Sequence, residues 1–205
     1  ETVDDLKLIP LKHQKEVLVR MEDVDIAYEQ HQVLKHLCMQ VRNGERVALQ
    51  GGNGCGKSSV LKMVLGINAC SGGRLELASG LVISYVPQDA SGLSGTLNGF
   101  AEKEGIDRTL FLAILRKLDF ERAQFEKRME DYSEGQKKKV LIAGSLCRQA
   151  HLYIWDEPLN YIDIFSRMQI EKLIRIFEPT MLFVEHDARF VKDAATRIVN
   201  FETLR

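Results

Sequence analysis

Apolar and polar positions recur with two different periods along this chain, and the two periods divide it into strand and helix segments. Near the beginning, residues 16–26 alternate with a period of two, which is typical of a β-strand. Residues 37–42 alternate more weakly and lead into the turn signal Asn43-Gly44. The chain is therefore predicted to begin with two or three short antiparallel strands.

The next region combines short apolar runs with a helical segment. Arg46–Leu49 is an apolar run that ends in a cluster of glycines, and Lys57–Leu65 places its apolar residues on one helical face before Gly66. Leu81–Val86 is predicted to be another strand, stopped by Pro87. The glycine cluster thus lies between a strand and the helix that follows it.

Between about residues 93 and 148 the period becomes helical. Apolar residues recur three and four positions apart from Leu110 to Leu118, a second helix is predicted from Glu121 to Met129, and a third from Ser133 to Arg148. The elements predicted after these are Leu152–Trp155, Ile164–Phe177, Met181–Glu185, Ala188–Ala195 and Ile198–Phe201. Apolar strands that alternate with helices favour a parallel sheet covered on both faces.

Composition and charge mainly exclude classes of protein. The length of 205 residues suits one domain, and 45% hydrophobic with 28% charged residues excludes a disordered tail, a collagen-like repeat and a disulfide-stapled mini-protein. No apolar run approaches the ~18 residues of a membrane span. A formal net charge of −1 does not indicate a polyanion partner, and the basic run Lys137–Lys139 is interpreted as a solvated helix face. Reduced thiols are expected for the cysteines, because their spacing fits no metal or disulfide pattern; these are Cys38, Cys55, Cys70 and Cys147.

The glycine cluster matches the phosphate-loop pattern GxxxxGK[ST] and reads Gly51-Gly52-Asn53-Gly54-Cys55-Gly56-Lys57-Ser58. Glycines recur because backbone N–H groups can surround an anion only where no Cβ blocks the approach, and the next helix directs its free N–H groups at the phosphates. Lys57 is expected to reach the β- and γ-phosphates, Ser58 to ligate Mg²⁺, and Ser59 to contact the α-phosphate. The loop alone does not separate kinases, GTPases, motors and transport ATPases.

The predicted strand Leu152–Trp155 ends in two acids, Asp156 and Glu157. At the carboxyl end of a buried strand, Asp156 is placed to hold Mg²⁺ through a water molecule. Glu157 lies on a different side of the backbone, where it can face the γ-phosphate and orient or activate the attacking water. An acidic pair of this kind is ambiguous by itself, and the phosphate loop gives it this meaning.

The run Tyr132-Ser133-Glu134-Gly135-Gln136 resembles the LSGGQ signature of ATP-binding cassette (ABC) proteins, with Tyr in place of Leu and Glu in place of the first Gly. Ser133 and Gln136 form an S-x-x-Q capping box at a predicted helix start, and Gly135 leaves that helix end open. In this family the signature meets the γ-phosphate held by another cassette. The resemblance therefore implies that Ser133, Gly135 and Gln136 bind ATP.

Other positions match the family in order, so the resemblance covers residues 16–201. Gln88 resembles the glutamine that contacts Mg²⁺ and the water site, and His186 resembles the switch histidine that contacts the γ-phosphate. Together with Glu157, these two residues are implied to be catalytic. Leu159–Asp163 resembles the D-loop, which crosses the dimer interface.

The nucleotide base also has an expected partner, because Tyr28 resembles the aromatic residue that stacks on adenine. ATP is favoured over GTP, since the sequence has no NKxD motif for reading guanine. The fold implied is α/β, a P-loop NTPase (RecA-like) core with a mainly parallel sheet, an N-terminal antiparallel β subdomain and a small α-helical subdomain at about 93–148. Residues 1–15 are expected to be a leader or the end of an interdomain linker, and 16–205 the nucleotide-binding domain.

Within the superfamily, the chain most resembles the second cassette of an ABC-F protein. Its signature continues into Lys137–Lys139, and the run Trp155–Asp163 reads WDEPLNYID where many transporter cassettes read more like DEPTSALD. ABC-F proteins carry two linked cassettes, have no membrane domain and act on the ribosome, and some protect it from antibiotics. The chain, which begins with Glu1, is then expected to be the C-terminal half of a longer cytoplasmic ATPase, without the linker that would contact ribosomal RNA and tRNA.

Other functions remain open. The ATP-binding subunit of a membrane transporter would share every motif and differ in its partner, a membrane domain. A cassette that only binds nucleotide is disfavoured by the intact Lys57, Asp156, Glu157 and His186, and a P-loop kinase would leave the signature without a role. We expect weak hydrolysis from a single cassette, because it cannot fold its own signature onto its own phosphate loop.

Overall fold

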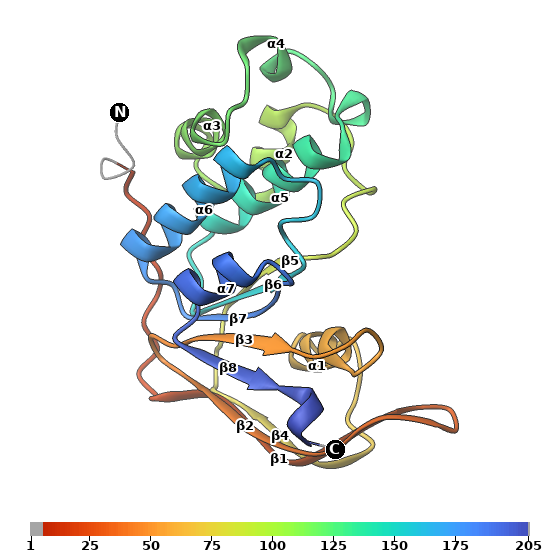
Figure 1. Cartoon of the computed structure of the whole chain (residues 1–205). Coiled ribbons are helices and arrows are strands. Elements are labelled where there is room, and N and C mark those ends of the chain that lie inside the picture. Colours follow the sequence, from red (N-terminus) through yellow and green to blue (C-terminus); the bar gives the residue numbers. More distant parts are fainter. Residues whose placement is uncertain (1–5, 205) are drawn as a thin grey trace.

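The computed structural model describes residues 6–204, and it arranges them as two sheets with a helical lobe at one end (Figure 1). The larger sheet has the order β5-β6-β7-β3-β8, and all four neighbouring pairs are parallel. Its strands are β3 (Arg46–Gln50), β5 (Ile83–Val86), β6 (Leu152–Asp156), β7 (Met181–Val184) and β8 (Arg197–Asn200). Every residue of β6 and β7 is buried, as expected for parallel strands covered on both faces. The mainly parallel α/β core is confirmed.

The smaller sheet is antiparallel and has the order β2-β1-β4. Its strands are β1 (Val17–Tyr28), β2 (His31–Arg42) and β4 (Gly72–Leu77). The prediction of two or three short strands at the start is wrong in length, because β1 and β2 span 12 residues each. The third strand, β4, follows the first helix and is missed by the sequence pattern, since two glycines open it and none of its residues is fully buried.

Helix α1 (Lys57–Val64) lies between the two sheets. Its buried residues Val60, Leu61 and Val64 share one apolar core with β1 and with one face of β3, β6 and β7. The loop that joins β3 to α1 is therefore attached at both ends to well-packed elements. This loop carries the phosphate-loop sequence.

The other face of the parallel sheet packs against the helices of a second apolar core. These helices are α2 (Leu97–Glu104), α3 (Arg108–Lys117), α4 (Arg122–Phe125), α5 (Glu134–Cys147), α6 (Ile164–Phe177) and α7 (Ala188–Ala194), with a short 3₁₀ turn at η2 (Met129–Asp131). A second 3₁₀ turn, η3 (Phe201–Leu204), instead contributes Phe201 to the first core. The predicted helix from Glu121 to Met129 is wrong: only α4 and η2 form there. The sequence between them is dominated by charged residues, and α4 buries none of its own.

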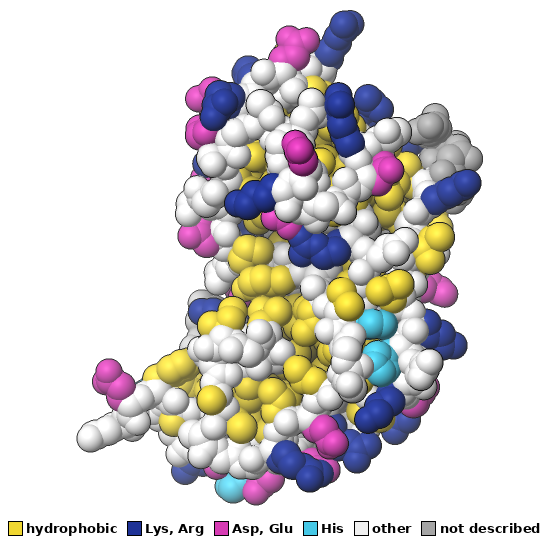
Figure 2. All heavy atoms as spheres, turned by 180° about the vertical axis from the view of Figure 1, so that it is seen from behind, with side chains coloured by type: hydrophobic (Ala, Val, Ile, Leu, Met, Phe, Trp, Pro, Cys, Tyr) yellow, Lys and Arg dark blue, Asp and Glu magenta, His cyan; other side chains and the backbone are white. Residues whose placement is uncertain are grey.

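Residues 1–5 of the expected leader lie outside the described part of the chain, and residues 6–16 precede β1 without regular helix or strand. Among the helices of residues 6–204, none is long and apolar enough for a membrane span. Figure 2, which views the molecule from behind, shows apolar side chains gathered across the middle of that face. Basic and acidic side chains are interspersed around them rather than separated by sign.

Candidate functional site

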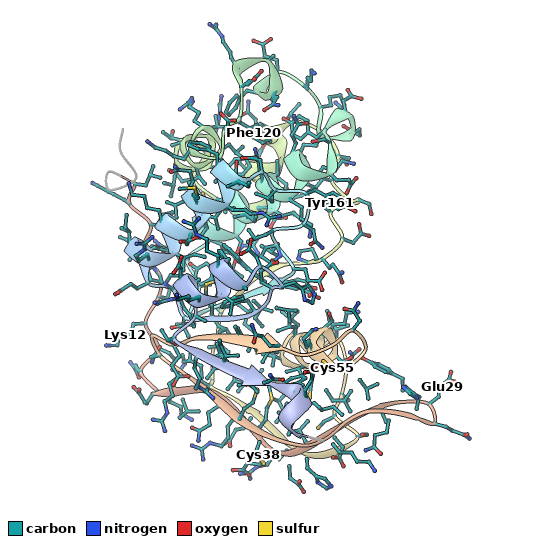
Figure 3. The ribbon with its side chains drawn as sticks, in the orientation of Figure 1. Lys12, Glu29, Cys38, Cys55, Phe120 and Tyr161 are labelled. Atoms are coloured by element: carbon teal, nitrogen blue, oxygen red, sulfur yellow. The ribbon has the colours of Figure 1, made fainter. Side chains whose placement is uncertain are left out.

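The loop between β3 and α1 curls so tightly that two of its glycines are required. Gly51 and Gly56 have φ values of 149° and 100°, in the region that favours glycine. A Cβ at Gly51 would lie 2.7 Å from the sulfur of Cys55, and one at Gly56 would lie 3.1 Å from a methyl group of Val33. Figure 3 labels Cys55 in this loop, at the beginning of α1.

The Lys57 side chain is buried and folds back over the loop. Its ammonium group donates hydrogen bonds to the carbonyl oxygens of Gly51 and Gly52. A cavity of about 280 Å³ lies beside it and is also lined by Glu185 and His186. The lysine therefore already lies at a hollow bordered by the loop and by the segment that follows β7.

Ser58 and Asp156 bring a hydroxyl and a carboxylate together next to this loop. The Ser58 Oγ donates to Asp156 Oδ1 over 3.3 Å, and the Asp156 side chain is buried at the end of β6. Burial raises the pKa of the Asp156 carboxyl, and the hydrogen bond from Ser58 acts in the opposite direction. Oxygen donors of this kind are the ligands that Mg²⁺ prefers, so the pair fits that cation.

Glu157 adopts an unusual backbone conformation, with φ at 47°. The left-handed region costs a residue with a side chain roughly 1–2 kcal/mol. The backbone N–H of Glu157 donates to the Val184 carbonyl over 2.8 Å, which holds the residue against the end of β7. Strain of this kind is often found at functional sites.

The Glu157 carboxylate is fixed by three side chains from different segments. Gln88 Nε2 donates to Oε2 over 2.9 Å, Asn160 Nδ2 donates to the same oxygen over 3.1 Å, and His186 Nε2 lies 2.8 Å from Oε1. The structure thus brings together Gln88, Glu157 and His186, which the sequence analysis places near one phosphate. Asn160 is an additional partner; it lies three residues after Glu157 in the D-loop-like run, but its sequence position gave no sign of this contact.

The run Lys137–Lys139 differs from its interpretation as a solvated helix face. Lys138 and Lys139 are 2% and 8% exposed, respectively. Burial of these two ammonium groups is compensated by oxygen partners. The Lys138 ammonium donates hydrogen bonds to backbone carbonyls, and the Lys139 ammonium forms an ion pair with the Asp163 carboxylate. A sequence run of like charges gives no indication of these distant partners.

The start of α5 has the capping box that the sequence predicts. Gln136 N–H donates to Ser133 Oγ over 3.2 Å, and Ser133 N–H donates to Gln136 Oε1 over 2.9 Å. A Cβ at Gly135 would lie 2.4 Å from the carbonyl oxygen of Tyr161, so only glycine permits this approach. In Figure 3, Tyr161 and Cys55 lie on the same side of the molecule, Tyr161 near the helical lobe and Cys55 near the antiparallel sheet.

Asp163 connects this region to α6. Its carboxylate caps α6 by accepting the Ser166 N–H over 2.8 Å, and it lies 2.8 Å from the ammonium nitrogen of Lys139. Burial alone would raise the pKa of Asp163, but the hydrogen bonds from Lys139 and Ser166 outweigh burial and bring that pKa to about 2.

Tyr28 lies at the end of β1, beside the first turn of α1. Its hydroxyl donates to Ser59 Oγ over 3.0 Å and accepts from Asn68 Nδ2 over 2.6 Å. The residue remains 43% exposed. Its ring is therefore held near the phosphate loop and stays accessible to a planar ligand.

A parallel sheet with a glycine loop between β3 and α1, and with an acid at the end of β6, defines the P-loop NTPase fold. The family model described as "ABC transporter" matches residues 34–160, more than half of the chain. The chain therefore belongs to this family and is an ABC ATPase domain.

Among curated relatives, ATP-binding protein Uup of Escherichia coli (strain K12) is 30% identical over 195 residues, which are 91% of this chain and 31% of Uup. Zinc import ATP-binding protein ZnuC of Marinobacter nauticus is 30% identical over 190 residues, 89% of this chain and 73% of ZnuC. In a crystal structure of archaeal ribosome recycling factor aABCE1 with the ribosomal stalk protein aP1, the matched chain is 26% identical with a TM-score of 0.78, and the match covers 93% of this chain and 38% of that one. The chain thus spans about a third of the length of Uup.

Proposed function

We propose that this domain binds ATP with Mg²⁺ and hydrolyses it after closing against a second cassette. One observation carries this proposal: the Glu157 carboxylate is held by Gln88, Asn160 and His186 close to the Ser58–Asp156 pair. Asp156 and Glu157 are consecutive at the end of β6. The carboxylate proposed to hold the metal therefore lies next to the carboxylate proposed to orient the attacking water. That arrangement suits phosphoryl transfer to water.

Each residue of the phosphate loop has a binding role in this proposal. Gly51–Gly56 present backbone N–H groups to the phosphates, and Ser59 contacts the α-phosphate. Lys57 exchanges its two carbonyl partners for the β- and γ-phosphate oxygens, a charge-assisted contact. Ser58 and Asp156 would hold Mg²⁺ together with Gln88. When bound, the metal neutralises charge on the phosphates.

Glu157 would orient the attacking water and accept its proton, because its carboxylate is ionisable and fixed in direction. Gln88 and His186 hold that carboxylate from either side, and both are able to turn toward the γ-phosphate once it is present. The Tyr28 ring would stack on adenine. These positions keep the reacting atoms close and aligned, which is where most of the acceleration in such reactions arises.

The signature is expected to act in the partner's site. Ser133 and Gln136 bond to each other at the start of α5, in the helical lobe, whereas the phosphate loop joins β3 to α1, on the side of the antiparallel sheet (Figure 1). In the proposal, Ser133, Gly135 and Gln136 of one cassette meet the γ-phosphate of the other, and ATP stabilises the closed pair more than the open one. A single cassette is therefore expected to hydrolyse ATP slowly.

For the whole protein we propose an ABC-F ATPase that acts on the ribosome in the cytoplasm, with antibiotic protection as one form of that action. The support is the Ser-Glu-Gly-Gln-Lys-Lys-Lys helix start, the WDEPLNYID run, and similarity to Uup, whose length leaves room for a second such domain. In this proposal residues 1–15 end an interdomain linker and 93–148 form the helical subdomain. A transporter subunit is the second candidate, because ZnuC matches over most of its own length.

The ATPase proposal is tested with Glu157→Gln in the full-length protein, with the exposed Glu126→Gln as the matched control. Glu157→Gln is expected to retain ATP binding by calorimetry, to abolish phosphate release and to favour the closed pair in size-exclusion chromatography with ATP. Unchanged phosphate release would remove Glu157 from the reaction.

The choice between the two whole-protein functions needs a partner assay. Co-sedimentation of the Glu157→Gln protein with ribosomes in ATP, and its absence in ADP, is expected for the ABC-F proposal. Co-purification with a membrane protein, and no ribosome binding, would instead establish the transporter subunit.

A further inference from the structure

Lys138 is a buried lysine whose ammonium group contacts the residues of the proposed catalytic site instead of solvent. It belongs to the first turns of α5, and its side chain is 2% exposed. Its ammonium group donates to the carbonyl oxygens of Pro87 at 3.3 Å, of Gln88, and of Glu157 at 3.4 Å. An ammonium group has three N–H donors, so these three carbonyls match its full capacity.

The three carbonyls belong to the two segments that present the proposed catalytic side chains. Pro87 and Gln88 follow β5 directly, on the path from the sheet into the helical lobe, and Glu157 follows β6. Glu157 is the residue with left-handed φ, and its own N–H is bonded to Val184. Lys138 therefore holds the carbonyl of a strained residue whose N–H is already fixed.

The surroundings of Lys138 are acidic as well. Asp156, Glu157, Glu185 and Asp89 all act to keep it charged, whereas burial has the larger effect and lowers its pKa. Asp156 and Glu185 are themselves buried, at 2% and 5% exposed. The direct bonds of the Lys138 ammonium go to backbone carbonyls, and these carboxylates act on its charge through space.

We propose that Lys138 is a positioning residue for ATP hydrolysis, which fixes the main chains of Gln88 and Glu157 against each other and against the signature helix. The inference rests on the proposed roles of Gln88 and Glu157. Lys138 is bonded to main-chain atoms rather than to the expected position of the nucleotide. It therefore acts on the rate of hydrolysis and little on ATP affinity. It also links the placement of α5, which carries Ser133, to the geometry at Glu157.

The experiment compares Lys138→Met, Lys138→Gln and Lys138→Arg in the full-length protein, with Lys103→Met as a control on the exposed surface of α2. Met removes the charge and the donors but keeps the length of the side chain, Gln keeps two donors, and Arg keeps both charge and donors. The measurements are kcat for phosphate release, ATP affinity by calorimetry, and hydrogen exchange of the backbone amides of residues 88–95.

We expect Lys138→Met to lower kcat about 10- to 100-fold, as for a small misplacement of reacting groups. ATP affinity should change less than about threefold, amides of residues 88–95 should exchange faster, and Lys138→Arg should recover a large part of the rate. If Lys138→Met does not fold, Lys138→Gln is judged by the same three measurements. Wild-type kcat in the Met or Gln variant overturns the inference, as does an equal loss of ATP affinity or an Arg variant no better than Met.

The failure of this inference is distinguishable from that of the proposed function. If wild-type protein does not hydrolyse ATP, or if Glu157→Gln leaves hydrolysis unchanged, the proposed function fails and the inference with it. If both of those controls behave as expected and Lys138→Met hydrolyses ATP normally, only the role of Lys138 is overturned.

Discussion

The ion pair between Lys139 and Asp163 permits a quantitative prediction for Asp163→Asn. Asparagine caps a helix about as well as aspartate, so α6 keeps its cap on Ser166 while the charge is removed. The substitution leaves the Lys139 ammonium, whose side chain is 10% exposed, without its carboxylate at 2.8 Å. The change therefore isolates the charge of the pair from its capping function.

The pKa of Asp163 gives the magnitude and the sign. This pKa is lowered from 3.8 to about 2 in the folded protein. The ionised carboxylate therefore stabilises the fold fully at a pH above the unfolded pKa of 3.8, and the stabilisation is lost as the pH falls through the folded pKa of about 2. At 1.36 kcal/mol per unit, a shift of about 1.8 units corresponds to ~2.4 kcal/mol. The Asp163 side chain is 47% exposed, so solvent screening reduces this contribution to about 1 kcal/mol.

Urea unfolding of wild type and Asp163→Asn at pH 7 and across pH 4 to 2 tests this reasoning, with the exposed Asp131→Asn as the control. The wild type should be more stable by about 1 kcal/mol at pH 7, or about 2–4 °C in Tm for a chain of this length. That difference should shrink toward pH 2, where Asp163 becomes protonated. A difference that stays constant with pH, or that Asp131→Asn reproduces, would refute the reasoning.

Two further substitutions test the nucleotide site and the signature. Lys57→Ala removes a charge-assisted contact worth roughly 1.5–3 kcal/mol, so calorimetry should show ATP affinity about 10- to 150-fold lower; an unchanged Kd would contradict the assignment. Ser133→Ala removes the cap bond to Gln136 and should lower the free energy of unfolding by about 1 kcal/mol. It should also weaken ATP-dependent association of the Glu157→Gln protein in size-exclusion chromatography, whereas association at wild-type strength would exclude Ser133 from the interface.

The sequence pattern is most informative where an element has strong periodicity or a strong cap. The helix predicted at Ile164–Phe177 coincides with α6, and the one predicted from Ser133 begins as α5 with its capping box formed. Both segments combine an apolar face with a side chain that satisfies free N–H groups at the helix start. Residues 121–129 lack such a face, and only short turns form there.

Contacts between distant segments are less accessible to sequence reasoning. Lys138 looks like one of three solvated lysines until its partners are known, and those partners lie 50 and 19 residues away. Asn160 similarly gives no sign that it bonds the Glu157 carboxylate. Burial of a polar side chain depends on which oxygen atoms the fold brings to it, and this information is not contained in local periodicity.

The topology of the parallel sheet explains why residues so far apart in sequence form one site. Gln88 follows β5, Glu157 follows β6 and His186 follows β7, and these three strands are neighbours in the order β5-β6-β7. The next strand in that order is β3, which leads into the phosphate loop. Since all these strands are parallel, their carboxyl ends lie along one edge, where ligands of open α/β sheets bind. A change in strand order would separate Gln88 or His186 from Glu157 even if every local motif were kept, so the site depends on the arrangement of the sheet as much as on the motifs.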